Sequence, residues 1–493
     1  MGKYSVPEEI RKLRPAGTQV KRQGDRFYVY ETSSTKKKVT NEDGTIVWKT
    51  FTKSGKCIGS ITSQDGFISN QGMLSQDEVT VLDYGDYAFA LKSSSTLQHL
   101  KAVFNPNDAN QIYALALIMF INGFTYMCDV YRLFSESYLS LYFPHVHTGE
   151  TALQTLYENL GRKREKVDAF NQRLIDHSSH RLAFDGHVIA CTSEKNDLSE
   201  FGYKASKLNS AQMNWMTAYD VDTKKPVASE MFCGSDPDKT AIQRFFERYY
   251  IQDTLFIVDR GFNTKDNKEL MSQNGNAYIV PMVQGRNDYN DVYSKIDFDK
   301  TDNFIYDKDG YSSLIYYQDF REINGKRYIA YVDTTRQAAE RKTYKENMDA
   351  GKKGFTPEGL IENEKNFGLF ILETSATVKS QYEIFCDYKS RWSLETFFDY
   401  VDNTLDFNGL YQQDSCRTQG LSFIMQISGM IYHELKEITD SKNLSLKATL
   451  KTLHGLKLSK QKNDWKVQNV VKAKRTLADV LGVNLQPSIV SPA

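Results

Sequence analysis

The sequence lacks the features of several protein classes. No run reaches the roughly 18 apolar residues of a membrane-spanning helix, and the longest candidate, residues 112–128, is interrupted by Asn122 and Gly123. The first residues contain no apolar segment of the kind that forms a secretory signal. The six cysteines include no C-x-x-C pair, which argues against a zinc ribbon and indicates reduced thiols. We therefore expect a cytoplasmic protein that does not enter a membrane.

The chain also lacks a net charge, but its charges are unevenly distributed. In total, 62 Lys and Arg balance 62 Asp and Glu. Residues 1–60 carry 13 basic and 6 acidic side chains, and residues 441–493 carry 10 and 2, so the other 380 residues hold 39 and 54. Basic ends around an acidic centre indicate contact with a polyanion and a centre with metal-binding carboxylates. Solubility alone would also explain lysine-rich ends.

With 493 residues, of which 40% are apolar, the chain is long enough for about three domains with packed cores. Helical and alternating apolar patterns divide it into segments of different character. The predicted segments are a basic β-rich region (1–84), a helical region (85–180), an α/β region in two parts (181–275 and 381–440) with a β-rich insertion between them (276–380), and a basic helical C-terminal region (441–493). Within the insertion, the charged stretch 335–366 is expected to be a loop.

Two aspartates lie where predicted strands end. Asp259 follows the apolar run 255–258 and precedes an Arg-Gly turn, and Asp185 lies between Leu-Ala-Phe and a glycine. Binding sites of open α/β sheets gather at the carboxyl ends of the strands. Each aspartate taken alone is more often a turn residue or a helix cap.

A third acid lies on a predicted helix. Tyr388, Arg391 and Glu395 recur at spacings of three and four residues, so they share one stripe of the helix beside an apolar stripe. Taken alone, this pattern is typical of a tyrosine packed on the core and a surface ion pair between Arg391 and Glu395.

Together, the segments DGHVIA, FIVDRGF and YKSRWSLETFF resemble the cut-and-paste DDE transposases of bacterial insertion sequences. Within that family they are similar to the group marked by Tyr-x2-Arg-x3-Glu-x6-Lys. The resemblance implies an α/β fold with an RNase H-like mixed-sheet core, interrupted by the β-rich insertion and flanked by helical N-terminal and C-terminal regions. It implies that Asp185, Asp259 and Glu395 are catalytic and hold Mg²⁺, with Mn²⁺ as a substitute. It also implies that Tyr388 and Arg391 bind DNA through a phosphate.

The activity implied by the resemblance is metal-dependent cleavage at the ends of the element, followed by strand transfer. Carboxylates are preferred ligands of hard divalent cations, and two such ions stabilise both the attacking and the leaving oxygen of a phosphodiester. No ATP is expected, and the sequence has no G-x-x-x-x-G-K-[ST] phosphate loop. The implied partners are double-stranded DNA, as terminal inverted repeats and target, and a second copy of the chain, because pairing two ends requires at least a dimer.

Contacts with DNA are also expected outside the core. In the helical region the candidates are Arg162, Lys163 and Arg164, although an exposed helix end often has the same composition. The basic N-terminal region is expected to read the transposon ends. The C-terminal lysines would add phosphate contacts, which give affinity without sequence choice, or a dimer surface.

The sequence departs from the signature at one position. The lysine expected seven residues after Glu395 is Asp402, and Asp399 lies on the same stripe. These anions would oppose a DNA phosphate, unless another lysine serves or Asp402 pairs with an arginine. The alternative function is therefore a catalytically impaired, transposase-derived protein that binds specific DNA. A general RNase H-like nuclease is a third hypothesis, which the large insertion disfavours.

Hairpin-forming members of the family stack a flipped base on a tryptophan of the insertion. In this chain every tryptophan lies outside the predicted insertion, at Trp48, Trp215, Trp392 and Trp465. A tyrosine such as Tyr316 or Tyr317 would have to take that place, so the sequence leaves a hairpin intermediate open.

Overall fold

The computed structural model describes residues 6–24, 26–40, 46–63, 66–69, 80–191, 193–202, 211–236, 238–299, 302–308, 310–323, 326–403, 412–461 and 464–486. The chain forms two compact units, Met1–Thr80 and Val81–Ala493. Each unit has hydrophobic core residues of its own.

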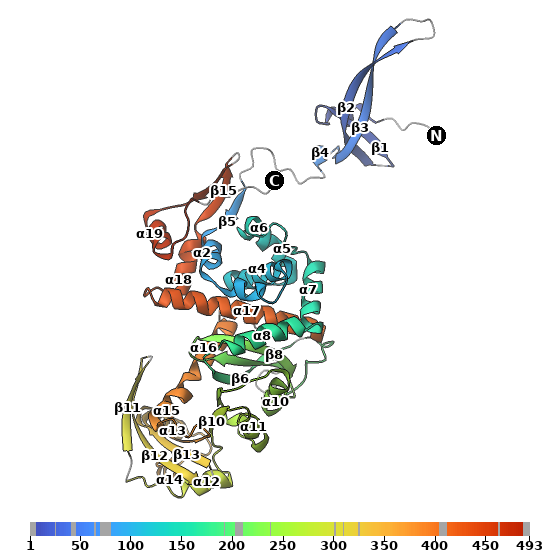
Figure 1. Ribbon diagram of the computed structural model, residues 1–493. Helices are drawn as coiled ribbons and strands as arrows, with labels where there is room; N and C mark the ends of the chain where they lie inside the picture. The colour runs from blue at the N-terminus through green and yellow to red at the C-terminus, as the bar shows by residue number, and fades with distance from the viewer. Residues whose placement is uncertain are drawn as a thin grey trace. The chain divides into compact units, whose positions relative to one another are not determined.

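The first unit is a four-stranded sheet in the order β1-β2-β3-β4, with antiparallel pairs throughout. Its elements are α1 (Glu8–Lys12), β1 (Thr18–Gln23), β2 (Arg26–Thr40), β3 (Ile46–Thr62) and β4 (Gly66–Ser69). A small core of Ile10, Val20, Val29 and Ile61 holds the helix on the sheet. β1 and β4 pair only with the inner halves of β2 and β3, so among the described residues 33–40 and 46–53 pair only with each other. These outer halves form a two-stranded ribbon that extends beyond the sheet (Figure 1).

The second unit begins with a short strand and a layer of helices. These elements are β5 (Val81–Asp83), α2 (Gly85–Ser93), α3 (Thr96–Lys101), α4 (Pro106–Asn122), α5 (Met127–Ser135), α6 (Leu139–Tyr142), α7 (Glu150–Arg162) and α8 (Glu165–Asp176). The long helix α17 (Ser415–Asp440) packs closely against α7, because a side chain on Gly161 or Gly420 would collide with the backbone of the facing helix. The C-terminal part of the chain is thereby fixed to the N-terminal helices.

Helix α4 accounts for the longest apolar stretch of the sequence. Pro106 starts the helix after the capping residue Asn105, and Gly123 ends it with a φ of 81°. Residues 112–120 are all buried, so this apolar stretch is a helix of the protein core. Among the described residues, no single helix is long and apolar enough to cross a membrane. Only α4 and α5 taken together pass that test of length and composition, and they are bent by 92°.

A nine-stranded mixed sheet forms the centre of the second unit, in the order β11-β12-β13-β14-β10-β9-β6-β7-β8. The strands are β6 (Arg181–Ala190), β7 (Gln212–Asp220), β8 (Lys225–Cys233), β9 (Leu255–Val258), β10 (Ala277–Pro281), β11 (Asp302–Lys308), β12 (Tyr311–Ile323), β13 (Lys326–Asp333) and β14 (Leu369–Thr374). β9 runs parallel to both β6 and β10, and the other neighbours are antiparallel. The predicted α/β class is confirmed.

The two faces of the central strands belong to different cores. On β6 and β9, Phe184 and Val258 join a core with α10 (Asp238–Arg248), whereas Ala183 and Ile257 join the larger core. That larger core includes apolar residues of α15 (Gln381–Ser390), α16 (Trp392–Asn403) and α17. Strand residues alternate between faces, so this division fixes the direction of every side chain on these strands.

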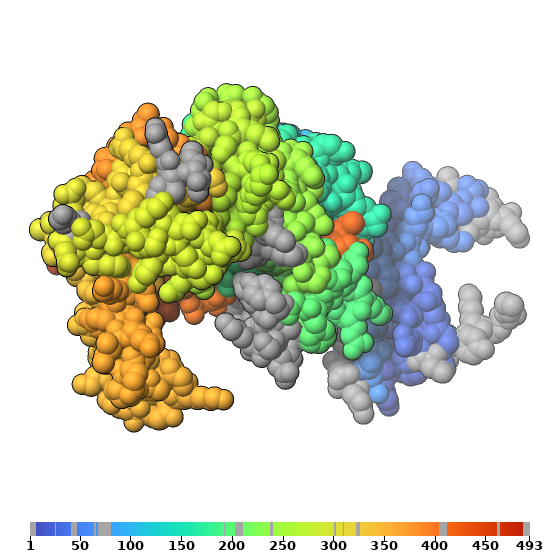
Figure 2. Space-filling view, turned by 90° about the horizontal axis from the view of Figure 1, so that it is seen from below, coloured from blue at the N-terminus to red at the C-terminus, as the bar shows by residue number. Residues whose placement is uncertain are grey.

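Strands β11 to β14 continue the central sheet from β10. In the space-filling view the yellow surface of this segment adjoins the yellow-green surface of the residues that precede it (Figure 2). The stretch 335–366 is not the expected loop, because it contains α13 (Thr334–Asp349) and α14 (Pro357–Glu362). No residue of either helix is buried, so the apolar periodicity that reveals most helices is missing. Side chains of Asp333 and Thr356 cap the two helices instead, and Arg336 pairs with Glu340.

The remaining elements connect these layers. They are η1 (Arg260–Phe262), α11 (Lys265–Leu270), α12 (Asn287–Tyr293), α18 (Leu446–His454), β15 (Lys457–Gln461), β16 (Asp464–Gln468) and α19 (Lys472–Leu481). The C-terminal region, expected to be helical, also contains the β15–β16 hairpin. This hairpin pairs with β5 in a three-stranded sheet and so joins the end of the chain to the start of the second unit.

Candidate functional site

Asp185 and Asp259 occupy equivalent places on two neighbouring parallel strands. Phe184 of β6 pairs with Val258 of β9, so the next residue on each chain segment is an aspartate. Paired strands lie about 4.8 Å apart. Because Phe184 and Val258 face the α10 core, alternation directs both aspartates to the opposite face, where α15 and α16 pack. The structure therefore brings the two predicted acids together. Only Asp259 follows the end of its strand, as predicted. Asp185 lies inside β6, which continues to Ala190 because it goes on pairing with β7, and only its pairing with β9 ends at Phe184.

The Asp185 carboxylate is held by two donors. It accepts a hydrogen bond of 2.8 Å from the Gly186 amide and another of 2.8 Å from Arg391 Nη1. Burial nevertheless raises the pKa of Asp185 to about 6, because it outweighs the lowering by Arg391 and the amide. The negative charges of Asp259 and Glu395 raise this pKa further. Asp185 thus lies within electrostatic reach of both other predicted acids.

Glu395 joins this group through Arg391. The helix carrying the motif is divided at Arg391, which keeps a right-handed helical conformation between α15 and α16. Its side chain is buried, and Nη1 also lies 3.5 Å from Glu395 Oε1. The Glu395 side chain remains 56% exposed. The predicted pair between Arg391 and Glu395 is therefore present, but the guanidinium is shared with Asp185.

Tyr388 lies one helical turn before Arg391 at the border of the site. Its ring packs on Phe370 at a centroid distance of 5.7 Å. Burial raises the pKa of its hydroxyl, while the nearby charge of Arg391 lowers it and that of Asp259 raises it. The Tyr388 ring is therefore packed against the protein, while its hydroxyl lies near the charges of Arg391 and Asp259.

The donor chemistry of the three acids suits a hard divalent cation, because carboxylate oxygens are its preferred protein ligands. Among the described residues, however, no three His, Cys, Asp or Glu side chains are arranged so that they could hold a metal ion. Arg391 instead supplies the positive charge between Asp185 and Glu395. The raised pKa of Asp185 is caused mainly by burial, and this one cation does not fully offset the burial of the carboxylate.

Asp402, which replaces the signature lysine, has a partner. Its Oδ1 lies 2.8 Å from Nε2 of His187 on β6, and the His187 ring stacks on Phe398 at 4.9 Å. The partner is thus a histidine and not the arginine considered from the sequence. Asp399 lies on the exposed side of α16.

The three candidate DNA contacts at the end of α7 differ in their surroundings. Arg162 is largely exposed and forms an ion pair of 2.9 Å with Glu158, and Lys163 is also exposed. Arg164 is only 15% exposed, and its guanidinium contacts Asp168 and Gln419 at 3.3 to 3.4 Å. Arg162 and Lys163 face solvent, whereas Arg164 connects α8 to α17 inside the protein.

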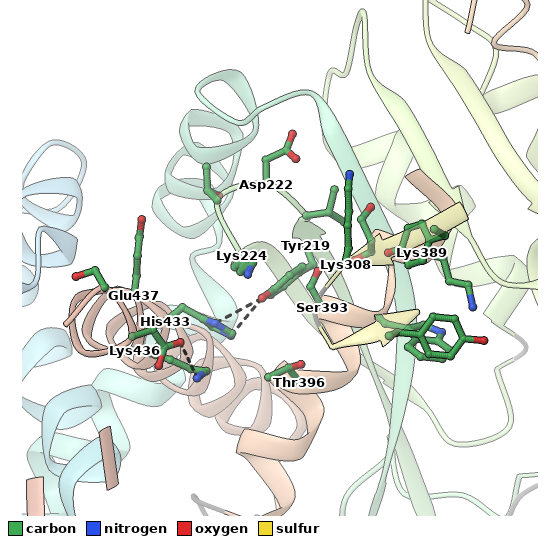
Figure 3. A pocket seen from close by; sticks show the side chains of 18 residues that line it. Tyr219, Asp222, Lys224, Lys308, Lys389, Ser393, Thr396, His433, Lys436 and Glu437 are labelled. Atoms are coloured by element: carbon green, nitrogen blue, oxygen red, sulfur yellow. Dashed lines mark hydrogen bonds and ion pairs between the residues drawn. The ribbon is translucent and has the colours of Figure 1, made fainter. Parts of the chain in front are cut away.

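A cavity of about 790 Å³ is lined in part by Trp392, Ser393 and Thr396 of α16 (Figure 3). The residues that line it do not include the three acids. At one end, the Tyr219 hydroxyl lies 3.4 Å from Nε2 of His433, and burial lowers the pKa of that histidine to about 3. Lysines and aromatic rings form much of the wall, among them Lys224, Lys308, Lys389, Lys436, Tyr306, Tyr311 and Trp392.

Lys389 was not singled out from the sequence, although it lies inside the YKSRW segment. Its ammonium group lies 4.5 Å from the Tyr311 ring and 4.7 Å from the Trp392 ring, and it pairs with Asp333 at 3.2 Å. Trp392 lies only three residues further along the chain, whereas Tyr311 and Asp333 belong to the distant strands β12 and β13, so no local pattern indicated these two contacts. Lys389 therefore connects α15 to strands β12 and β13 of the insertion.

Part of the chain matches the model of a known protein family. Residues 176–410, slightly less than half of the chain, match the model of the family described as "Transposase DDE domain". This match supports assignment of the chain to a DDE transposase family. The matched segment includes Asp185, Asp259 and Glu395, together with the insertion between the last two. No curated protein matches the chain.

Among solved structures, the chain is similar to a piggyBac transposase in a synaptic complex with hairpin DNA. The two superpose with a TM-score of 0.39 and 12% sequence identity, over 84% of this chain and 87% of that chain. A TM-score this low does not establish a shared fold.

Proposed function

We propose that this protein is the transposase of a bacterial insertion sequence, which cuts DNA at the ends of its element and joins those ends to target DNA. One observation carries the proposal. Asp185 and Asp259 each follow the last residue by which β6 and β9 pair in parallel, on the same face of the sheet, and Arg391 links Asp185 to Glu395 within the segment that matches the family. The proposal includes a cytoplasmic enzyme that works as at least a dimer, because two DNA ends must be held together.

We infer that strands β6 to β10 form an RNase H-like core. The inference is supported by three antiparallel strands, β8-β7-β6, continued by the parallel pair β9-β10, with helices packed on both faces. The insertion predicted over 276–380 lies between Asp259 and Glu395. Its first strand, β10, pairs with β9 and is assigned here to the core, and β11 to β14 follow it before the chain enters α15. This order matches the interruption that the resemblance implies.

In this proposal Asp185, Asp259 and Glu395 hold Mg²⁺ or Mn²⁺. When bound, such ions polarise a phosphodiester and activate an oxygen nucleophile. The chain's own contribution is to bring carboxylates from two strands and one helix to a common face. Of the two acids paired with Arg391, Glu395 is the more exposed, so its side chain has room to change conformation on α16 when a metal ion binds.

Arg391 is proposed to contact a DNA phosphate. Among the described residues, its buried Nε has no hydrogen-bond partner, so the guanidinium has unused donor capacity. A planar guanidinium can bind two phosphate oxygens at once. Tyr388 borders the same charged group and is proposed to contact the same phosphate. Arg162 and Lys163 would add contacts away from the acids.

Nicking of DNA that contains the element's own ends tests the proposal. The substrate is the genomic sequence flanking this reading frame, incubated with Mg²⁺ or Mn²⁺ and the wild type, Asp259→Ala or Glu395→Gln. The wild type should cut at the ends, and both variants should bind the DNA without cutting. If the wild type and Asp259→Ala bind equally and neither cuts, the protein is not this enzyme. If Glu395→Gln still cuts, Glu395 is not the third acid.

A second candidate is a transposase-derived protein that binds DNA without cutting it. The exposed Asp399 and the Asp402 side chain, where the family has a lysine, favour it. The contact of Asp402 with His187 weakens the argument for this second candidate, because the carboxylate already has a hydrogen-bond partner within the protein. The same nicking experiment separates the two functions. Cleavage that ignores the end sequence would instead indicate a general nuclease.

A further inference from the structure

The outer ribbon of β2 and β3 in the first unit has a surface that its own sheet does not use. Along residues 33–38 and 48–54 every side chain is exposed. The ribbon is nevertheless regular, because the strands pair in register from Ser33 with Lys53 to Thr40 with Ile46. A regular exposed ribbon without a core of its own is a candidate for contact with another molecule.

The charge of the ribbon has one sign. Residues 33–40 and 46–53 contain five lysines and no acidic residue, and the two acids of the connecting segment, Glu42 and Asp43, lie outside the described residues. Lys37 is placed directly opposite Lys49. Like charges directly opposite each other destabilise a strand pair, so an anion bound between them would remove that repulsion.

Strand alternation separates the side chains into two faces. One face carries the Lys37–Lys49 pair, Lys53 and Phe51, of which Phe51 is 50% exposed. The opposite face carries two lysines and a tryptophan. These are Lys36, Lys38 and Trp48, and the Lys38 ammonium already lies 5.3 Å from the Trp48 ring. We call the first of these the Lys37 face. It has three lysines that are not stacked on a ring of the ribbon.

We propose that the Lys37 face of the ribbon binds duplex DNA in the major groove. This inference rests on the proposed function, and it names the element that holds DNA outside the acid site. The major groove, about 12 Å wide, admits a two-stranded β-ribbon. In the groove, the lysines reach phosphates and Phe51 meets the edges of bases, where a thymine methyl group offers an apolar contact. The bulk of the affinity comes from the phosphates and depends on salt.

Two pairs of matched variants of the full-length chain test the inference. Lys37→Ala/Lys49→Ala/Lys53→Ala is compared with Lys36→Ala/Lys38→Ala, and Phe51→Ala with Trp48→Ala. The probe is a fluorescent mixed-sequence duplex of about 30 bp, three helical turns, and binding is measured by anisotropy in EDTA at several salt concentrations. All substituted side chains are exposed, and removing the opposed Lys37 and Lys49 relieves repulsion, so the thermal unfolding temperature should not fall and serves as the folding control.

The triple variant should bind on the order of tenfold to 100-fold more weakly, and the slope of log K against log salt should fall by about 2 to 3, since each phosphate contact contributes about 0.9. The double variant should lose clearly less. Phe51→Ala should weaken binding more than Trp48→Ala. Wild-type binding by the triple variant, or equal losses from both lysine variants, would overturn the inference. Equal competition by duplex RNA of the same sequence would also overturn it, because the A-form major groove is too narrow for side chains to read.

Cleavage measured on the same variants separates this inference from the proposed function. If the triple variant binds normally and the wild type cuts the element's ends, the ribbon inference fails while the transposase stands. If binding depends on the Lys37 face but the wild type never cuts, the ribbon inference stands and the enzyme fails. The Asp259→Ala variant should keep the wild-type salt slope, because its substitution leaves the ribbon intact.

Discussion

Glu373 and Asp185 are carboxylates of the same central sheet in opposite circumstances. Glu373 on β14 is fully buried, and it accepts from Lys268 Nζ and the Tyr278 hydroxyl at 2.8 Å and pairs with Lys326 Nζ at 3.1 Å. Burial favours protonation of Glu373, but these partners outweigh it and lower its pKa. Burial also lowers the pKa of Lys268, yet two lysines facing one carboxylate keep Glu373 ionised.

At Asp185 the balance is reversed. Burial outweighs Arg391 and the Gly186 amide, and two further carboxylates add negative charge. A buried carboxylate whose partners outweigh the cost of burial stabilises the fold. One whose partners do not outweigh that cost contributes little to the fold and is suited to bind a cation. The comparison thus distinguishes a carboxylate that serves the fold from one that serves a function.

Substitution of Asp185 should give the largest effect on cleavage. In Asp185→Asn we expect cleavage of element ends to fall on the order of 10³-fold or more, equivalent to about 4 kcal/mol of barrier. The melting temperature should stay the same or rise, since a buried and incompletely paired charge is removed. Gel assays of nicking and thermal unfolding measure the two quantities. A clear loss of stability with cleavage retained would assign Asp185 to the fold.

Glu373→Gln should show the opposite behaviour. Without the carboxylate, the largely buried Lys268 loses its ionic partner, so we expect about 3 kcal/mol of destabilisation, as for other broken buried pairs. Urea unfolding of the full chain measures this loss. Cleavage per folded molecule should remain within a few-fold of the wild type. A variant as stable as the wild type would show that Glu373 is not compensated in the way described.

Acidification should weaken the fold through the carboxylates with lowered pKa values. Glu373, Asp333 and Glu434 all have such shifts because hydrogen bonds and cations outweigh their burial. Their contribution is complete above the ordinary pKa, 4.5 for glutamate, and is lost as the pH falls through the lowered folded-state values. The free energy of unfolding should therefore decrease below about pH 4.5. Glu373→Gln should show a shallower decrease, and an equal slope would contradict this assignment.

The smallest effects are expected at the end of α7. There too, one charged side chain, Arg164, has partners inside the protein, whereas Arg162 and Lys163 face solvent. Arg162→Ala/Lys163→Ala removes exposed charges and should weaken DNA binding several-fold, with the salt slope reduced by up to about 2 and the stability unchanged. Arg164→Ala removes internal contacts with Asp168 and Gln419 and should lower stability. Anisotropy and urea unfolding distinguish the two variants. If Arg164→Ala weakened DNA binding without loss of stability and the double variant lowered stability instead, the assignment of Arg162 and Lys163 to DNA and of Arg164 to the fold would be wrong.

The sequence predicted the elements that have a local pattern. Asp259 follows a short apolar run, so its place at a strand end was predictable. The same reasoning was wrong for Asp185, which lies inside β6, and parallel pairing of β6 with β9 brings the two acids together. Helices α13 and α14 were missed because no residue in them is buried. The partners of Asp402 and Lys389 come from β6 and β13, far away in the chain, and no local pattern could have revealed them.

The position of Arg391 was also beyond sequence reasoning. Its spacing from Glu395 predicted one ion pair, but the second pair, with Asp185, depends on how α15 and α16 pack on the sheet. Tertiary packing therefore decides which groups share a cation.

The most direct measurement of the central claim is Mn²⁺ binding to the full-length chain with a DNA duplex containing the element's end, monitored by the loss of the free-ion electron paramagnetic resonance signal. We predict that the wild type and Glu373→Gln bind Mn²⁺, whereas Asp185→Asn and Asp259→Ala bind it far more weakly. Equal Mn²⁺ binding by all four proteins would contradict a cation site built on the paired strands β6 and β9.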